Sequence, residues 1–186
     1  MMHKNDDAEQ PVDINETDIV EEVYIHNAGL VIISPFIPAL FRKSGYMNVD
    51  GFISDVHLNK GIRLLEFLAT GNDAVLDIDL SLNKILCGAD PEAPLIGDSM
   101  PGQAEKDLVN GLLESVIAQW AILGDTSVNG LRGAFFVRNG KLTEPSGSFN
   151  LLVEKAGYDM LLDHLPWVLS PIKFSWMPKD LFVTWR

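Results

Sequence analysis

The hydrophobic pattern of this chain is densest between residues 25 and 41, where polar side chains are few. Three β-branched residues, Val31 to Ile33, follow one another directly. Consecutive apolar positions fit neither an alternating strand nor a one-sided helix, so they indicate a segment buried on more than one side. The stretch is too short and too interrupted by proline to span a membrane. We therefore interpret residues 25–41 as the segment through which the chain enters its core.

Two prolines divide this segment. Ser34 followed by Pro35 predicts the start of a helix, with Ser34 as the N-cap and Pro35 at the first helical position. Pro38 removes one early hydrogen bond, so the helix is expected to be short or bent.

Apolar residues at helical spacing continue downstream. In the first such helix, Ser54 is the expected N-cap and Gly71 the expected stop. Asparagine followed by glycine at 139–140 then predicts a tight turn, and the period changes to that of strands. The predicted helices cover residues 55–70, 81–87, 103–123, 127–136 and 158–165. The predicted strands cover residues 142–144, 149–155 and two short stretches around 172–174 and 182–184.

These elements predict a mainly helical α+β fold, in which a compact helical body carries a small antiparallel sheet from the C-terminal third. Residues 23–186 are expected to form one globular domain. A loop rich in proline and glycine at 89–102 is the best candidate for an internal division.

Charge is distributed unevenly along the chain. The formal net charge is −12, and residues 1–22 hold eight acidic residues against one lysine, a net of −7 that leaves −5 for the other 164 residues. We expect residues 1–22 to be a mobile acidic tail, which either keeps the protein in solution or docks a basic partner. Such a charge argues against nucleic-acid binding, which needs lysine and arginine to displace phosphate counterions.

Cys87 is the single cysteine, so an internal disulfide is excluded. No apolar stretch is long enough for a membrane span, and no secretory signal is visible, so we expect a cytoplasmic protein. Later incorporation into a released or cell-associated particle is compatible with this expectation.

Candidate chemistry is sparse, and we expect no catalytic residue, metal or cofactor. Cys87 at a helix end more often acts as a small hydrophobe than as a nucleophile. His26, His57 and His164 are far apart and lack metal-ligand spacing, so structural roles are favoured. Asp77 and Asp79 lie two residues apart, without an identifiable partner acid.

A structural joint is the more ordinary role for the polar and small residues at the start of the dense stretch. We expect the side chains of His26 and Asn27 to hydrogen-bond nearby backbone groups. We expect the prolines to turn the buried segment into its helix. The predicted joint consists of His26, Asn27, Gly29, Pro35 and Pro38.

Tryptophans gather near the C-terminus, where three of the four lie within 19 residues: Trp167, Trp176 and Trp185. Such side chains either close a core or anchor a partner interface, and core closure is the commoner role. Together with Phe36 they are nevertheless our candidates for a partner contact.

The order of several segments resembles one family, the tape measure proteins of contractile injection systems, which are phage-tail-like particles of bacteria. The segments are YIHNAGLVIISPFIPALF (24–41), GIRLLEFLATG (61–71), LNKILCG (82–88), LLESVIAQWAILGDTSVNGLRGAFFVRNGKL (112–142) and YDMLLDHLPWVLSPIKFSWMPKDLFVTW (158–185). Their joint order is specific and covers nearly everything after the acidic tail.

This resemblance implies a non-enzymatic assembly component that contacts the tube, baseplate or cap of such a particle. A tape measure fixes the number of tube rings, and a helical ruler must be long because each residue adds only about 1.5 Å. No heptad run here could span many rings, so capping, nucleation or docking at one tube end is physically easier than direct measurement. The alternatives are a small hydrolase using Cys87 or a His/Asp set, and a transient assembly chaperone for a tube component.

Overall fold

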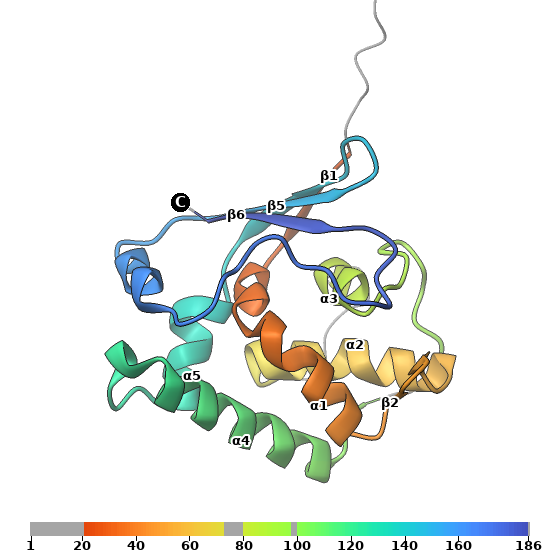
Figure 1. Ribbon diagram of the computed structural model, residues 1–186, viewed down its shortest axis with the longest axis horizontal. Coiled ribbons are helices and arrows are strands. Elements are labelled where there is room, and N and C mark those ends of the chain that lie inside the picture. Colours follow the sequence, from red (N-terminus) through yellow and green to blue (C-terminus); the bar gives the residue numbers. More distant parts are fainter. Residues whose placement is uncertain (1–20, 73–79, 98–99, 186) are drawn as a thin grey trace, which may run out of the picture.

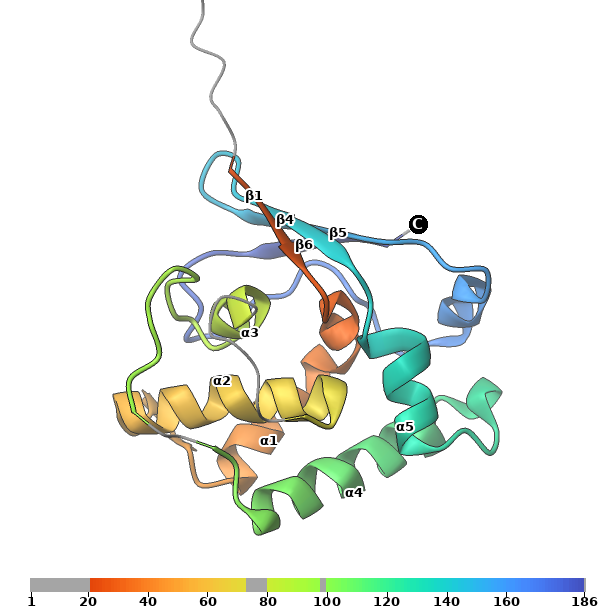
Figure 2. The same cartoon turned by 180° about the vertical axis from the view of Figure 1, so that it is seen from behind.

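One mixed sheet lies on one side of the molecule and the helices lie together beneath it (Figures 1 and 2). The structure is a computed structural model that describes residues 21–72, 80–97 and 100–185. The sheet has the order β1-β4-β5-β6. Its strands are β1 (Glu22–Ile25), β4 (Gly140–Thr143), β5 (Phe149–Val153) and β6 (Leu181–Trp185).

The helical layer contains α-helices, 3-10 helices and a π-helix. It confirms the mainly helical α+β class. The α-helices are α1 (Ile37–Lys43), α2 (Asp55–Thr70), α3 (Ser81–Leu86), α4 (Gln103–Gln119) and α5 (Val128–Leu131). The 3-10 helices are η1 (Ala28–Phe36), η3 (Ala121–Leu123) and η5 (Asp159–His164), and η4 (Arg132–Phe136) is a π-helix. A small hairpin of β2 (Met47–Asn48) and β3 (Gly51–Phe52) precedes α2.

The sheet differs from the expected antiparallel arrangement in two ways. First, β1 from the N-terminal side of the described chain pairs with β4, a partner that the local pattern did not indicate. Second, β5 and β6 are parallel, because the chain between them crosses back beneath the sheet through η5 and a long irregular segment before β6 begins. The expected strand at 172–174 is reduced to a single bridge between Ile172 and Leu181.

The tight turn predicted at 138–141 is wrong. Gly140 begins β4, and Arg138 forms a bridge with Asn27. A Cβ at Gly140 would lie 2.6 Å from the Cβ of Ala28 and 3.1 Å from the carbonyl oxygen of Leu152. The glycine therefore permits close packing of three chain segments and does not serve a turn.

Several local predictions are confirmed. Ser54 caps α2, since its hydroxyl accepts a hydrogen bond from the backbone N–H of His57, and Gly71 ends the helix with a φ of 75°. In α5, the Ser127 hydroxyl accepts a hydrogen bond from the N–H of Gly130 at 3.0 Å. The segment from Val31 to Ile33 is fully buried, as its consecutive apolar residues predicted.

The predicted helix start at Ser34 is wrong. Ser34 and Pro35 lie inside η1, and α1 begins at Ile37 with Pro38 in its first turn. In an α-helix the Pro35 ring would clash with the carbonyl four residues earlier, and neither proline has an N–H to donate. Pro35 therefore disfavours an α-helical form before Ile37, where α1 begins.

Buried apolar residues form one cluster that extends from Ile25 to Leu181 and includes residues on both sides of the 89–102 loop. The single domain over residues 23–186, with an internal division at 89–102, stays a prediction. The acidic tail lies outside the described residues except for Glu21 and Glu22, and Glu22 belongs to β1.

Gly29 marks the closest approach between the first buried segment and the π-helix. A Cβ added there would lie 1.6 Å from the carbonyl oxygen of Phe135. We expect Gly29→Ala to lower the free energy of unfolding by about 3 kcal/mol or more, because backbone must move to admit the methyl group. Chemical denaturation measures this loss.

Gly111→Ala is the matched control, since Gly111 lies within α4 and a Cβ there would meet nothing within 4 Å. It should raise stability by about 0.5–1 kcal/mol through helix propensity. Equal stabilities for the two variants would contradict the close packing described for Gly29.

Candidate functional site

The carboxylate of Glu66 lies buried where the β1–η1 joint meets α2 and α3. Glu66 is only 1% exposed. Its Oε1 lies 3.0 Å from Nε2 of His26, and its Oε2 accepts a hydrogen bond from Nδ2 of Asn27 at 2.8 Å. Asn83 of α3 donates to the same Oε2 at 3.3 Å. One carboxylate thus connects three elements that are far apart in sequence.

The asparagines complete this network. Asn27 also donates to Oδ1 of Asn83 at 2.7 Å, and Asn83 donates to the carbonyl oxygen of Ile62 at 3.1 Å. The Oδ1 atom of Asn27 is buried and has no hydrogen-bond partner among the described residues. Both amide nitrogens can only donate, so Oε2 of Glu66 accepts a hydrogen bond from each asparagine.

This arrangement suits structure better than chemistry. In the part of the chain that is described, no group of three or more His, Cys, Asp or Glu side chains is placed to hold a metal ion. Cys87 is buried, and burial raises the pKa of its thiol well above the usual value. A nucleophile must reach the thiolate form, which this environment disfavours.

The remaining histidine and carboxylate candidates do not meet at a site. His57 lies beside the cap of α2, where its Nδ1 is 2.8 Å from the Ser54 hydroxyl. His164 is the last residue of η5. Asp77 and Asp79 lie outside the described residues.

A second buried polar cluster centres on Arg138 and Asp159. The guanidinium Nη1 lies 2.9 Å from Oδ1 of Asp159, and both side chains are almost fully buried. The guanidinium also lies over the rings of Tyr158 and Trp185, 5.3 and 5.5 Å from their centroids. The indole N–H of Trp185 donates to Oδ2 of Asp159 at 3.2 Å, so the cluster fixes the end of β6.

Arg132 forms a third buried contact, at the C-terminal end of α2. Its guanidinium donates to the carbonyl oxygens of Leu68 and Phe67, at 3.0 and 3.3 Å, and lies over the Phe67 ring. A cation is favoured there because the last carbonyls of a helix carry partial negative charge. Burial lowers the pKa of Arg132 from its ordinary high value.

The C-terminal tryptophans turn their indole N–H groups inward. Trp167 donates to the carbonyl oxygen of Ile32 at 2.7 Å, and Trp176 donates to that of Leu86 at 3.0 Å. Trp176 also stacks on Phe174, with 4.8 Å between the ring centroids. Each of these tryptophans keeps part of its surface exposed, so its indole hydrogen bond is compatible with a contact to a partner protein.

Phe36 and Trp167 meet edge to face, with ring centroids 5.0 Å apart. Phe36 also lies at one end of a groove between α1 and α4, whose apolar floor is formed mainly by Leu40, Leu108 and Leu112. In α4 the structure buries Val109 and Leu113 and leaves Leu108 and Leu112 half-buried.

A family model described as contractile injection system tape measure protein matches residues 2–185. The chain belongs to this family. The resemblance inferred from the ordered sequence segments is thereby confirmed, and the matched region includes most of the acidic N-terminal stretch. A search of curated proteins and a search of solved structures each gave no match.

Membership identifies the chain as a tape measure component of a contractile injection system, a structural class of protein. In the described part of this family member, no helix combines the length and the apolar character needed to cross a membrane.

Sequence analysis missed the buried charges that organise this family member. Glu66 stands inside the apolar run RLLEFLATG, and Asn83 inside LNKIL. Arg138 was assigned to a turn, and Asp159 and Arg132 were not singled out. A polar residue on the apolar face of a predicted helix was the available signal for Glu66 and Asn83, but their partner Asn27 is 39 and 56 residues away.

Glu66→Leu tests the buried carboxylate. Leucine has no acceptor, so the buried N–H groups of Asn27 and Asn83 that now donate to Oε2 would lose that acceptor. We expect the free energy of unfolding to fall by about 2–4 kcal/mol. Glu114→Leu, at an exposed position of α4, should change it by less than about 0.5 kcal/mol. A loss at Glu66 no larger than the control loss would disprove the structural role of the network.

Asp159 gives a prediction about pH. Burial alone would raise its pKa, but the N–H of Ala156 and the Arg138 guanidinium outweigh this and hold the pKa below the ordinary value. Its stabilisation is therefore fully present above the unfolded-state pKa of about 3.9 and is lost as the pH falls through the lower folded-state pKa.

Asp159→Asn should accordingly lower the free energy of unfolding by about 3 kcal/mol at pH 7, and the difference from the unaltered protein should shrink as the pH falls below about 4. Denaturant titrations at several pH values measure this. Asp125→Asn, at an exposed position, serves as the control. A loss at Asp159 that stays constant across this pH range would refute the assignment.

Proposed function

We propose that the described part of this tape measure family member docks at one end of the particle tube and does not measure tube length by its own extension. The observation that supports this is helix length. The longest helix, α4, has 17 residues. At about 1.5 Å per residue it reaches about 26 Å. The helices of the described residues fold back on one another beneath the sheet, and none of them projects as a rod (Figure 2).

In this proposal the contact involves the α1–α4 groove and the Phe36–Trp167 pair at its end. Phe36 and Trp167 offer half-exposed aromatic surface, and Leu108 and Leu112 offer half-exposed aliphatic surface. Aromatic side chains beside an apolar groove are typical anchors of protein interfaces. Trp176 and Trp185 support the contact from behind, because their indoles hold the C-terminal segment on α3 and on Asp159.

The partner in this proposal is a protein component of the tube, baseplate or cap. The acidic chain favours a partner with basic side chains around the contact, and its charge disfavours DNA. Assembly takes place in the cytoplasm, and the protein then stays in the particle.

Deleting the gene should change tube length or abolish particles, as seen by electron microscopy. Mass spectrometry of purified particles should detect the chain and give its copy number. Particles of normal length formed without the protein would refute the proposed function. If the protein were instead an assembly chaperone, its deletion would prevent assembly, but the chain would be missing from purified particles.

The groove is tested by Ala39→Glu, which places a charge at an exposed groove position of α1 without burying it. We expect the number of copies per particle to fall at least about tenfold, because a carboxylate in an apolar contact must lose its water. Ala118→Glu is the matched control, at an exposed position of α4 that does not line the groove. Equal incorporation of both variants would exclude the groove as the contact.

A further inference from the structure

No described helix covers the outer face of the sheet (Figures 1 and 2), and apolar side chains are exposed on this face. Alternation along the strands turns Ile25, Leu142 and Leu151 toward the helices, where they are buried. The residues between them point outward. Tyr24, Leu152 and Phe182, on three different strands, are 74%, 49% and 43% exposed.

Strand register places these outward side chains in two rows across the sheet. Tyr24 pairs with Lys141, Lys141 with Leu152, and Leu152 with Thr184. The next row runs through Glu22, Thr143, Asn150 and Phe182. Each row therefore has an aromatic side chain at one edge of the sheet, and the two aromatic residues lie at opposite edges.

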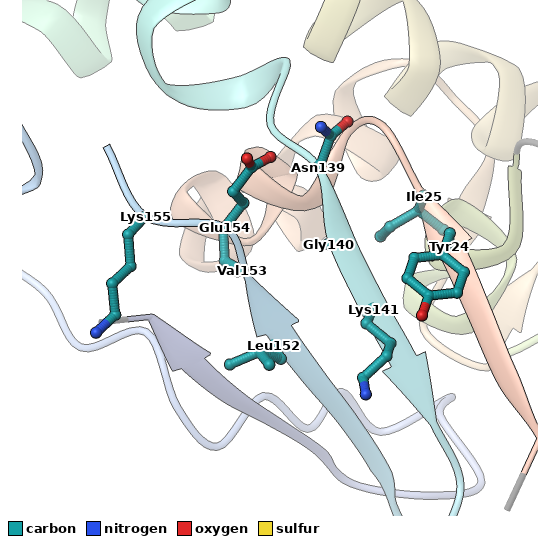
Figure 3. A pocket seen from close by; sticks show the side chains of 9 residues that line it. All are labelled: Tyr24, Ile25, Asn139, Gly140, Lys141, Leu152, Val153, Glu154 and Lys155. Carbon is teal, nitrogen blue, oxygen red and sulfur yellow. The ribbon is translucent and has the colours of Figure 1, made fainter. Parts of the chain in front are cut away.

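Between the first-row side chains the face is hollowed. Figure 3 shows Tyr24 on β1 and Leu152 on β5 on either side of Lys141, around this hollow. The hollow has a volume of about 590 Å³. An aromatic or leucine side chain from a facing surface would fit a space of this size.

Charge on this face differs from charge on the whole chain. The chain carries −12, so two copies repel one another on approach. On the outer face, however, Glu22 and Lys141 form an ion pair at 2.7 Å, and the next two residues after β5, Glu154 and Lys155, add one charge of each sign. The face is thus locally neutral and carries both signs beside its apolar side chains.

From this combination we infer that the outer face of the sheet binds a second copy of the same chain, face to face. A basic or an acidic partner surface is complementary to a face of the opposite charge. A neutral face that carries both signs is instead complementary to the same face of a second copy. The contact lies on the opposite side of the molecule from the α1–α4 groove, so it does not depend on the proposed docking function (Figure 1).

Edge pairing through β6 is a less favourable route to the same dimer. The N–H and C=O of Leu181 already bond to Ile172, at 3.0 and 2.8 Å. The N–H of Val183 donates to the Ser170 hydroxyl at 2.9 Å. This covered edge resists the addition of another strand.

Sedimentation equilibrium of the full chain tests the inference. The unaltered protein should form dimers at micromolar concentration, and Leu152→Glu should raise the dissociation constant at least about tenfold. Ile122→Glu is the matched control, because Ile122 is 48% exposed on η3, outside the sheet. It should leave the dimer intact. Tyr24→Glu, also at an exposed position, provides a second variant if Leu152→Glu fails to fold as judged by circular dichroism.

Salt gives an independent readout. Raising the ionic strength from about 0.05 to 0.5 M should strengthen the dimer, because screening reduces the repulsion between two acidic chains while apolar contact persists. A protein that stays monomeric at about 100 μM, a dimer that both face variants leave intact, or a dimer that salt dissociates would each overturn the inference. A monomer whose Leu152→Glu variant is lost from particles, while Ala39→Glu is retained, would assign the face to a particle component instead.

Discussion

A buried carboxylate is the constraint on which this structure depends most. A carboxyl group taken out of water needs hydrogen-bond partners, and leaving it unpaired costs several kcal/mol. Glu66 contacts His26 and accepts from Asn27 on one side, and it accepts from Asn83 on the other. The carboxylate therefore fixes where β1 ends, where η1 begins and how α3 lies on α2. Since Asn27 also bridges to Arg138, the position of β4 follows from the same joint.

Two buried arginines extend this principle to the C-terminal half. Arg138 joins the segment before β4 to Asp159 and, through Asp159, to Trp185 at the end of β6. Arg132 holds the π-helix against the end of α2. Neither contact is a surface ion pair of the kind that contributes little. Because each arginine has several donors in a fixed plane, one side chain satisfies carbonyls or carboxylates from different elements and specifies their relative placement.

The two exposed apolar surfaces lie on opposite sides of this polar framework. The sheet presents an open, neutral face, and the α1–α4 groove presents half-buried leucines beside Phe36 and Trp167. A component built to join other components needs surfaces of this kind more than it needs a catalytic centre. Short helices that fold back on one another suit the proposed docking role, and the family assignment places the chain in a contractile injection system.

The sequence alone determined the features that depend on neighbouring residues, and it also indicated the family. The cap at Ser54, the stop at Gly71 and the burial of Val31 to Ile33 follow from chemistry within a few positions. Tertiary structure decided what depends on distant partners: β1 joined the sheet, β6 lay parallel to β5, and Gly140 met Ala28. The Glu22–Lys141 pair spans 119 residues, and no local period encodes such a partner. Likewise, a glutamate has the same intrinsic helix propensity whether its side chain faces water or Asn27. Only the folded chain could therefore show Glu66 as the centre of the joint.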